Sequence, residues 1–171
     1  MRSRISTRPA SAAKRTRRWT DVTYDRARQL LSTINGVTVA DGGPPLTVNI
    51  APEQFAAVAA FVKETIGCEF FSFLSAIDWK ADGLEVVAWV DNLDSNMSLV
   101  LRSKLGPEGK SCPSLVGVYK GANWMERECY EMFGIHFDGH PDLRRLLLPE
   151  DWEGYPLLKS YAVDTPHPPY R

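Results

Sequence analysis

The sequence lacks a run of about eighteen or more apolar residues, the length that a helix needs to cross a bilayer, so it predicts no membrane-spanning helix. It also has few cysteines: Cys68, Cys112 and Cys129 are odd in number, far apart, and form no Cys-x-x-Cys pair. They therefore indicate neither a disulfide framework nor a tetranuclear iron–sulfur cluster, which usually takes four thiolates. We interpret each as a small buried residue in a protein of a reducing compartment.

Acidic residues are absent from the first twenty positions, which carry seven basic ones, whereas the remainder carries thirteen basic and twenty-one acidic residues, or −8. An Arg-rich, acid-free segment is typical of a transit peptide, or of a basic arm that contacts a partner, lipid headgroups or RNA. A solvated tail is the simplest interpretation. We expect residues 1–18 to form an arm that is disordered or bound to a partner.

Residues 19–148 predict one α+β domain, with a mixed or antiparallel sheet of about four to five strands packed with helices. Apolar residues recur at helical spacing over 24–34 and 52–66, and turn residues end both stretches. Strands are expected at 37–40, 46–50, 69–77, 84–91 and 97–103. The stretch 69–77 is almost entirely apolar and indicates a buried strand. Residues 111–119 are expected to form a short helix or turn.

A third helix is expected from position 123, with Asn123 as its N-cap, Glu126 completing a capping box, and Gly134 as a left-handed C-cap. At about 100° per residue, Glu126 falls beside the apolar arc, where a carboxylate needs a partner. A Gly-His-Pro turn predicts that Arg144 or Arg145 comes back to pair with it. The apolar arc holds Ala122, Met125, Cys129, Met132 and Phe133, and the opposite, solvated or partner-facing arc holds Trp124, Arg127, Glu128 and Glu131.

His136 and His140 are four residues apart, which on a helix would suit a metal ion. Gly139 and Pro141 break any helix there, so metal binding is not expected, and His140 is expected to fix a turn. From residue 149 onward, five prolines argue against regular structure. We expect residues 149–171 to be an extended tail that packs along a partner through its aromatic residues, Trp152, Tyr155, Tyr161 and Tyr170.

Together, Glu126-Arg127-Glu128, residues 131–135, residues 139–147 and residues 149–159 resemble the signature of the 30-kDa subunit of NADH:quinone oxidoreductase, or respiratory complex I. The segment 154–160 departs from the usual Gly-His-Pro-Leu-Arg-Lys-Asp of that family. The resemblance implies signature residues with structural or partner-interface roles. They are Glu126, Arg127, Glu128, Glu131, Phe133, Gly134, His140, Pro141, Asp142, Arg144, Arg145, Trp152, Tyr155, Pro156 and Lys159.

The resemblance further implies a non-catalytic subunit of the hydrophilic arm, with no catalytic residue and no cofactor of its own. Iron–sulfur clusters, FMN and quinone would belong to partner subunits. The implied partners are the quinone-site subunit, the terminal-cluster subunit and the ferredoxin-like subunit. The assembly would transfer electrons from NADH to quinone and translocate protons, at the cytoplasmic face of a bacterial inner membrane rather than in a mitochondrial matrix.

Two alternatives remain at this point. The equivalent subunit of an energy-converting hydrogenase, formate hydrogenlyase, or a ferredoxin- or F420-dependent quinone oxidoreductase would share the signature. A stand-alone enzyme or ligand-binding domain would instead use a cluster of Glu126, Glu128, His140 and Arg144. The absence of redox ligands and of a phosphate-binding glycine loop favours the structural subunit.

Overall fold

A five-stranded mixed sheet forms the centre of the protein in the computed structural model, which describes residues 22–162 and 164. The arm expected at 1–18 and Tyr170 of the tail lie outside the described residues. The strand order is β1-β2-β5-β4-β3, with β2 and β5 parallel and the other neighbours antiparallel. The strands are β1 (Val37–Val39), β2 (Leu46–Ile50), β3 (Phe70–Asp78), β4 (Leu84–Asn92) and β5 (Met97–Gly106). The predicted α+β class is confirmed.

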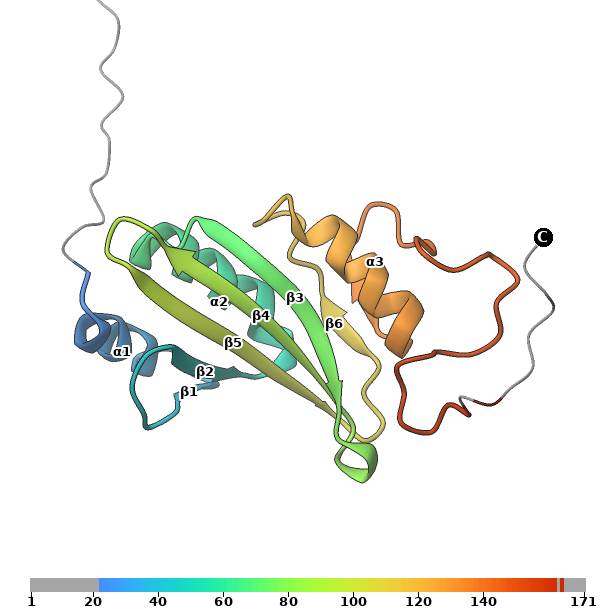
Figure 1. The fold of residues 1–171 in the computed structure, drawn as a ribbon. Helices are drawn as coiled ribbons and strands as arrows, with labels where there is room; N and C mark the ends of the chain where they lie inside the picture. Colours follow the sequence, from blue (N-terminus) through green and yellow to red (C-terminus); the bar gives the residue numbers. More distant parts are fainter. Residues whose placement is uncertain (1–21, 163, 165–171) are drawn as a thin grey trace, which may run out of the picture.

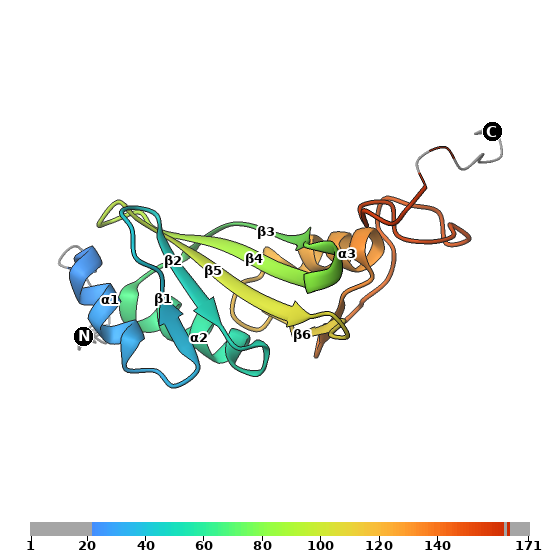
Figure 2. The same cartoon turned by 90° about the horizontal axis from the view of Figure 1, so that it is seen from below.

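Two helices from the N-terminal part of the chain pack against the sheet, as Figures 1 and 2 show. Helix α1 (Tyr24–Ser32) begins after Thr23, whose Oγ1 accepts a bond from the Arg26 amide at 3.3 Å. A 3₁₀ turn, η1 (Pro52–Gln54), leads into α2 (Phe55–Phe61), and a π-helical turn, η2 (Val62–Ile66), ends at Gly67 with φ +81°. The apolar stripe of α2 and η2 is buried, as predicted from its spacing.

Strand β3 differs from the buried strand that its composition predicted. Phe70 and Phe73 are 51% and 40% exposed, whereas Leu74 and Ala76 are buried. The reason is that β3 is the last strand of the sheet and carries the core on one face only. An unbroken apolar run cannot distinguish a strand buried on both faces from one with an open aromatic face.

A small β-α-β unit completes the fold beside β3 (Figure 1). It consists of β6 (Ser111–Pro113), α3 (Ala122–Phe133) and β7 (His136–Asp138), and β6 and β7 pair in parallel. The helix or turn expected over 111–119 is therefore a short strand followed by a turn. Helix α3 covers the outer edge of β3, where the Leu74 amide donates to Met125 Sδ at 3.1 Å. Because α3 covers this edge, the Leu74 amide has a hydrogen-bond partner within the chain.

Candidate partner-docking site

Helix α3 begins one residue before its expected cap. Its N-cap is Gly121, no side chain caps the first turn, and Asn123 lies inside the helix. The predicted Asn123 cap is wrong, and with it the capping box with Glu126. The other end is confirmed: Gly134 adopts φ +76°, and its amide bonds the Tyr130 carbonyl at 3.0 Å.

Glu126 is fully buried and has no cationic partner among the described residues. Its carboxylate accepts one hydrogen bond from Ser114 Oγ and one from the Leu115 amide, both at 2.6 Å. The predicted pairing with Arg144 or Arg145 is therefore wrong. Burial raises the pKa of Glu126 to about 7, and the two hydrogen bonds oppose that rise only in part. The helical wheel placed Glu126 correctly near the core, but it contains no information on the 114–115 turn.

The predicted return of the chain to α3 does occur, through other residues and through backbone groups (Figure 1). Arg127 donates from Nε to the Arg144 carbonyl and from Nη2 to the Arg145 carbonyl, both at 3.0 Å. Glu131 accepts from three consecutive amides, of Leu146 at 2.9 Å, Leu147 at 2.8 Å and Leu148 at 3.2 Å. Glu131 is fully buried and Arg127 is 7% exposed, so their expected place on a solvated or partner-facing arc is wrong. We call residues 144–148 the return segment.

His140 fixes the turn that leads into the return segment. Its Nε2 lies 3.1 Å from the Asn123 carbonyl, and its Nδ1 accepts from the Asp142 amide at 3.0 Å. This arrangement assigns the proton to Nε2. Arg144 Nε in turn donates to Asp142 Oδ2 at 2.9 Å, and both side chains are exposed. Pro141, which precedes Asp142 in the turn, is also exposed. No group of three or more potential metal ligands occurs among the described residues.

Apolar side chains remain on the outer surface of this assembly. Trp124 on α3 is 60% exposed and Leu147 of the return segment is 64% exposed. The Arg127 guanidinium lies 5.3 Å from the centre of the Trp124 ring and holds it by a cation–π contact. Glu128, also on α3, is exposed. These residues are available for contact with another protein.

The described part of the tail contacts this same chain, although no helix or strand occurs in it. The Tyr155 ring lies against Gly134, where an added Cβ would come within 2.9 Å of it. The Leu157 amide donates to the Met132 carbonyl at 3.1 Å. The Lys159 amide donates to Asp78 Oδ2 at 2.7 Å. Trp152 and Pro156 are half-buried. Packing of the tail along a partner stays a prediction.

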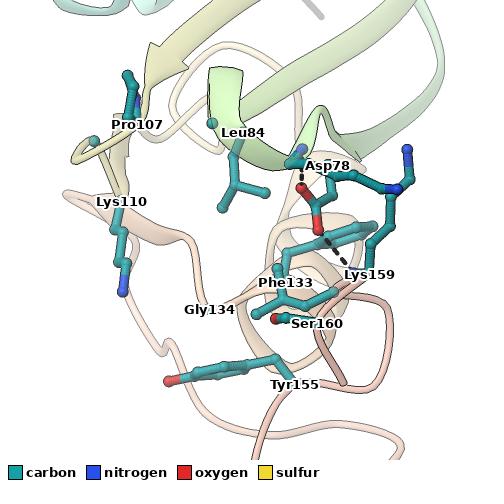
Figure 3. Close-up of a pocket in the computed structure, with 13 residues that line it drawn as sticks. Asp78, Leu84, Pro107, Lys110, Phe133, Gly134, Tyr155, Lys159 and Ser160 are labelled. Atoms are coloured by element: carbon teal, nitrogen blue, oxygen red, sulfur yellow. Dashed lines mark hydrogen bonds between the residues drawn. The ribbon is translucent and has the colours of Figure 1, made fainter. Parts of the chain in front are cut away.

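A pocket of about 590 Å³ lies between the tail, the end of α3 and the β3–β4 turn (Figure 3). It brings together four of the predicted signature residues, Phe133, Gly134, Tyr155 and Lys159. The other predicted residues do not line it. Sequence reasoning missed the remaining lining, which includes Asp78, Lys80, Leu84 and Lys110, because these residues come from loops and strand ends without a motif.

The three cysteines are buried, as predicted. Burial raises the pKa of the Cys68 and Cys112 thiols to about 12, and raises that of Cys129 as well. Since the thiolate is the nucleophile and the metal ligand, these thiols are inert at neutral pH.

Residues 48–167 match the family described as "Respiratory-chain NADH dehydrogenase, 30 Kd subunit". The chain is 41% identical over 122 residues to the corresponding NADH-quinone oxidoreductase subunit of Rhodobacter capsulatus, covering 69% of this chain and 61% of that protein. It is 39% identical over 130 residues to the corresponding subunit of Salinispora arenicola, covering 73% and 53%. The chain thus spans about half to three-fifths of the length of these two relatives.

Two solved structures resemble the fold. One is a trypsin-resistant fragment of Nqo5, with a TM-score of 0.62 and 26% identity, covering 70% of this chain and 98% of the fragment. The other is a chain of an archaeal membrane-bound sulfane sulfur reductase, with a TM-score of 0.71 and 18% identity, covering 81% of this chain and 85% of the other. At that identity, the second resemblance concerns the fold alone.

Proposed function

Because the chain belongs to the family of 30-kDa subunits of respiratory-chain NADH dehydrogenase, we propose that it is a non-catalytic structural member of the hydrophilic arm of an NADH-quinone oxidoreductase. In this proposal, partner subunits hold FMN, the iron–sulfur clusters and quinone. The assembly transfers electrons from NADH to quinone and couples this transfer to proton translocation.

The engagement of the charged signature residues within the chain carries the proposal. Glu126 bonds the 114–115 turn, and Arg127 and Glu131 bond the return segment. A general acid or base needs a free position within hydrogen-bond reach of a substrate. These three side chains are instead buried and occupied by polar groups of this chain. They hold the 114–115 turn and the return segment in position on α3, which is the role expected of side chains in a structural subunit.

The exposed residues of α3 and the return segment fit contact with other subunits, since tryptophan is enriched among interface residues with large binding contributions. We assign this surface to the quinone-site subunit, with the terminal-cluster and ferredoxin-like subunits as further neighbours. In the described part of the chain, no helix is long and apolar enough to span a bilayer. We place the chain peripherally, at the cytoplasmic face of the membrane, attached through its partners.

A stand-alone enzyme that uses Glu126, Glu128, His140 and Arg144 is not supported by the geometry. Glu126 lies on the buried side of α3, Glu128 is exposed, and His140 and Arg144 are engaged in the 140–144 turn. None of these four lines the 590 Å³ pocket. The two bacterial relatives also favour NADH-quinone oxidoreductase over a hydrogenase-type complex, because the sulfane sulfur reductase resembles the chain in fold only.

Affinity purification of the full chain from membranes of its own organism tests the proposal. We expect it to co-purify with proteins that carry iron–sulfur clusters and with NADH:quinone reductase activity, whereas the isolated chain shows no turnover. Recovery of the chain without cluster-bearing proteins, or turnover by the isolated chain, would contradict the proposal.

A further inference from the structure

The pocket beside the tail combines an apolar floor with a basic rim. Leu84 and Phe133 belong to the floor, and Figure 3 shows Leu84 pointing into the cavity. Lys80, Lys110 and Lys159 line its edges and are all exposed. Such a combination of apolar walls and a few charged groups is typical of binding sites.

Close backbone contacts hold the walls of the pocket in place. Gly83 has φ +87°, and a Cβ there would lie 2.0 Å from the Gly106 carbonyl oxygen, so the end of β5 sits directly against the start of β4. On the opposite wall, the Tyr155 ring lies on Gly134. A cavity bounded in this way exists before any ligand arrives, which lowers the entropic cost of binding.

The positive charge of the rim is only partly offset within the described part of the chain. None of the three lysines has an ion pair there. Asp78 is the one carboxylate among the lining residues, and its two oxygens accept from the Lys80 and Lys159 amides, each at 2.7 Å. The lining therefore carries a net charge of about +2, in a chain that is −8 beyond its first twenty residues. This local excess of opposite sign favours an acidic ligand.

We propose that this pocket receives an extended segment of a partner protein in which an apolar side chain has acidic residues two positions before and after it. The apolar side chain would contact Leu84 and Phe133, and the carboxylates would meet Lys110 on one side and Lys159 on the other. The proposal rests on the proposed function, because it supposes partner subunits, and it adds a second contact surface to that of α3.

The arrangement of the charges favours a peptide over a single headgroup or a free anion. Lys110 and Lys159 stand on different sides of the cavity, with the floor residues between them (Figure 3). In an extended chain every second side chain lies on the same face, so an apolar side chain can enter the middle while acidic side chains two residues before and after it reach the lysines on either side. One phosphate group would reach only one side.

Labelling with acetic anhydride tests the occupancy in the intact, purified complex. We expect Lys80, Lys110 and Lys159 to react at least fivefold more slowly in the complex than in the free chain. Zero-length carbodiimide cross-linking should also join Lys110 or Lys159 to an aspartate or glutamate of a partner. Equal reactivity of these lysines in both states would overturn the proposal, even if the chain still co-purifies with the complex. Protection that disappears on removal of lipid would overturn it as well, in favour of a lipid headgroup.

A charge reversal supplies the second test. The variant Lys110→Glu should lower the yield of co-purified partners at least threefold and leave the melting temperature of the free chain unchanged, because the Lys110 side chain is exposed. Lys120→Glu is the matched control, since Lys120 is exposed and does not line the pocket. An equal loss in the control would show a general charge effect and overturn the specific assignment.

Discussion

The sheet region, residues 24–106, and the α3 region, residues 111–162, are stabilised in different ways. The sheet region buries apolar side chains on a regular scaffold, and Glu85 is its one buried charged residue among those described. The α3 region buries three charged residues, Glu126, Arg127 and Glu131, within one helix of twelve residues. Those charges bond mostly to backbone groups of irregular segments.

The difference shows what each kind of pattern can reveal. Burial of an apolar stripe has no preferred partner, so the stripe alone predicts the helix and the face that it buries. A buried charge needs a specific donor or acceptor, and here that partner is a loop amide or carbonyl with no sequence signature. The α3 region therefore uses polar side chains to hold segments that have no regular structure of their own.

Among the changes that test this difference between the two regions, removal of Glu131 should lower the free energy of unfolding most. In Glu131→Ala, the three amides of the return segment lose a charged acceptor, and each hydrogen bond to a charged group contributes about 1.5–3 kcal/mol. Allowing for partial hydration of the released segment, we expect a loss of about 3–4 kcal/mol in the free energy of unfolding, measured by denaturant titration. Glu128→Ala on the exposed side of α3 is the control and should change stability by about 0.5 kcal/mol or less.

Titration of Glu126 should give the next largest effect. Its pKa of about 7 in the fold, against an ordinary value of 4.5, means that the folded state binds the extra proton between these pH values. The contribution of Glu126 to the free energy of unfolding therefore falls by about 3 kcal/mol in total as pH rises from 4.5 to 7, and it is constant above pH 7. Glu126→Gln should remove this slope, since an amide does not titrate. An equal slope in this variant and in the control Glu128→Gln would show that folding does not raise the pKa of Glu126.

The sheet region could be predicted from sequence in most of its elements, including strands β3, β4 and β5 and Gly67 as the residue that ends η2. The prediction failed at the exposure of β3, because composition does not show which strand is last. In the α3 region, the sequence predicted the helix, its Gly134 cap and the return of the chain. It assigned the wrong partner to Glu126, expected the buried Glu131 on a solvated or partner-facing arc, and expected Asn123 as the N-cap. The bonds of Glu126 and Glu131 are set by tertiary contacts with loops that have no sequence signature.

Substitution of Gly134 measures how much the backbone conformation at the end of α3 contributes to stability, apart from the buried polar side chains. Gly134→Ala places a Cβ at φ +76° and within 2.9 Å of the Tyr155 ring. We expect a loss of about 1–2 kcal/mol from the left-handed conformation, plus displacement of the tail. Gly117→Ala is the control, because a Cβ at Gly117 meets nothing within 4 Å. If Gly134→Ala and Tyr155→Ala prove additive in a double-mutant cycle, the contact between them has no energetic role.

Removal of Trp124 should have the smallest effect on the isolated chain. Because its ring is 60% exposed, Trp124→Ala should cost about 0.5–1 kcal/mol, mainly the contact with Arg127. Recovery of partner subunits should nevertheless fall about tenfold or more, as for a central interface residue. Leu93→Ala is the control, since Leu93 is 70% exposed in the β4–β5 turn, far along the chain from α3. Equal recovery of partner subunits with both variants would show that Trp124 does not lie in the interface.

We propose above all that the charged residues of α3 support assembly and take no part in chemistry. Glu131→Gln in the assembled complex decides this, through two measurements on the same membranes: the amount of complex, and the NADH:quinone turnover per complex. We expect less complex and unchanged turnover per complex. A normal amount of complex with turnover reduced tenfold or more would refute the proposal, because Glu131 would then act in the reaction itself.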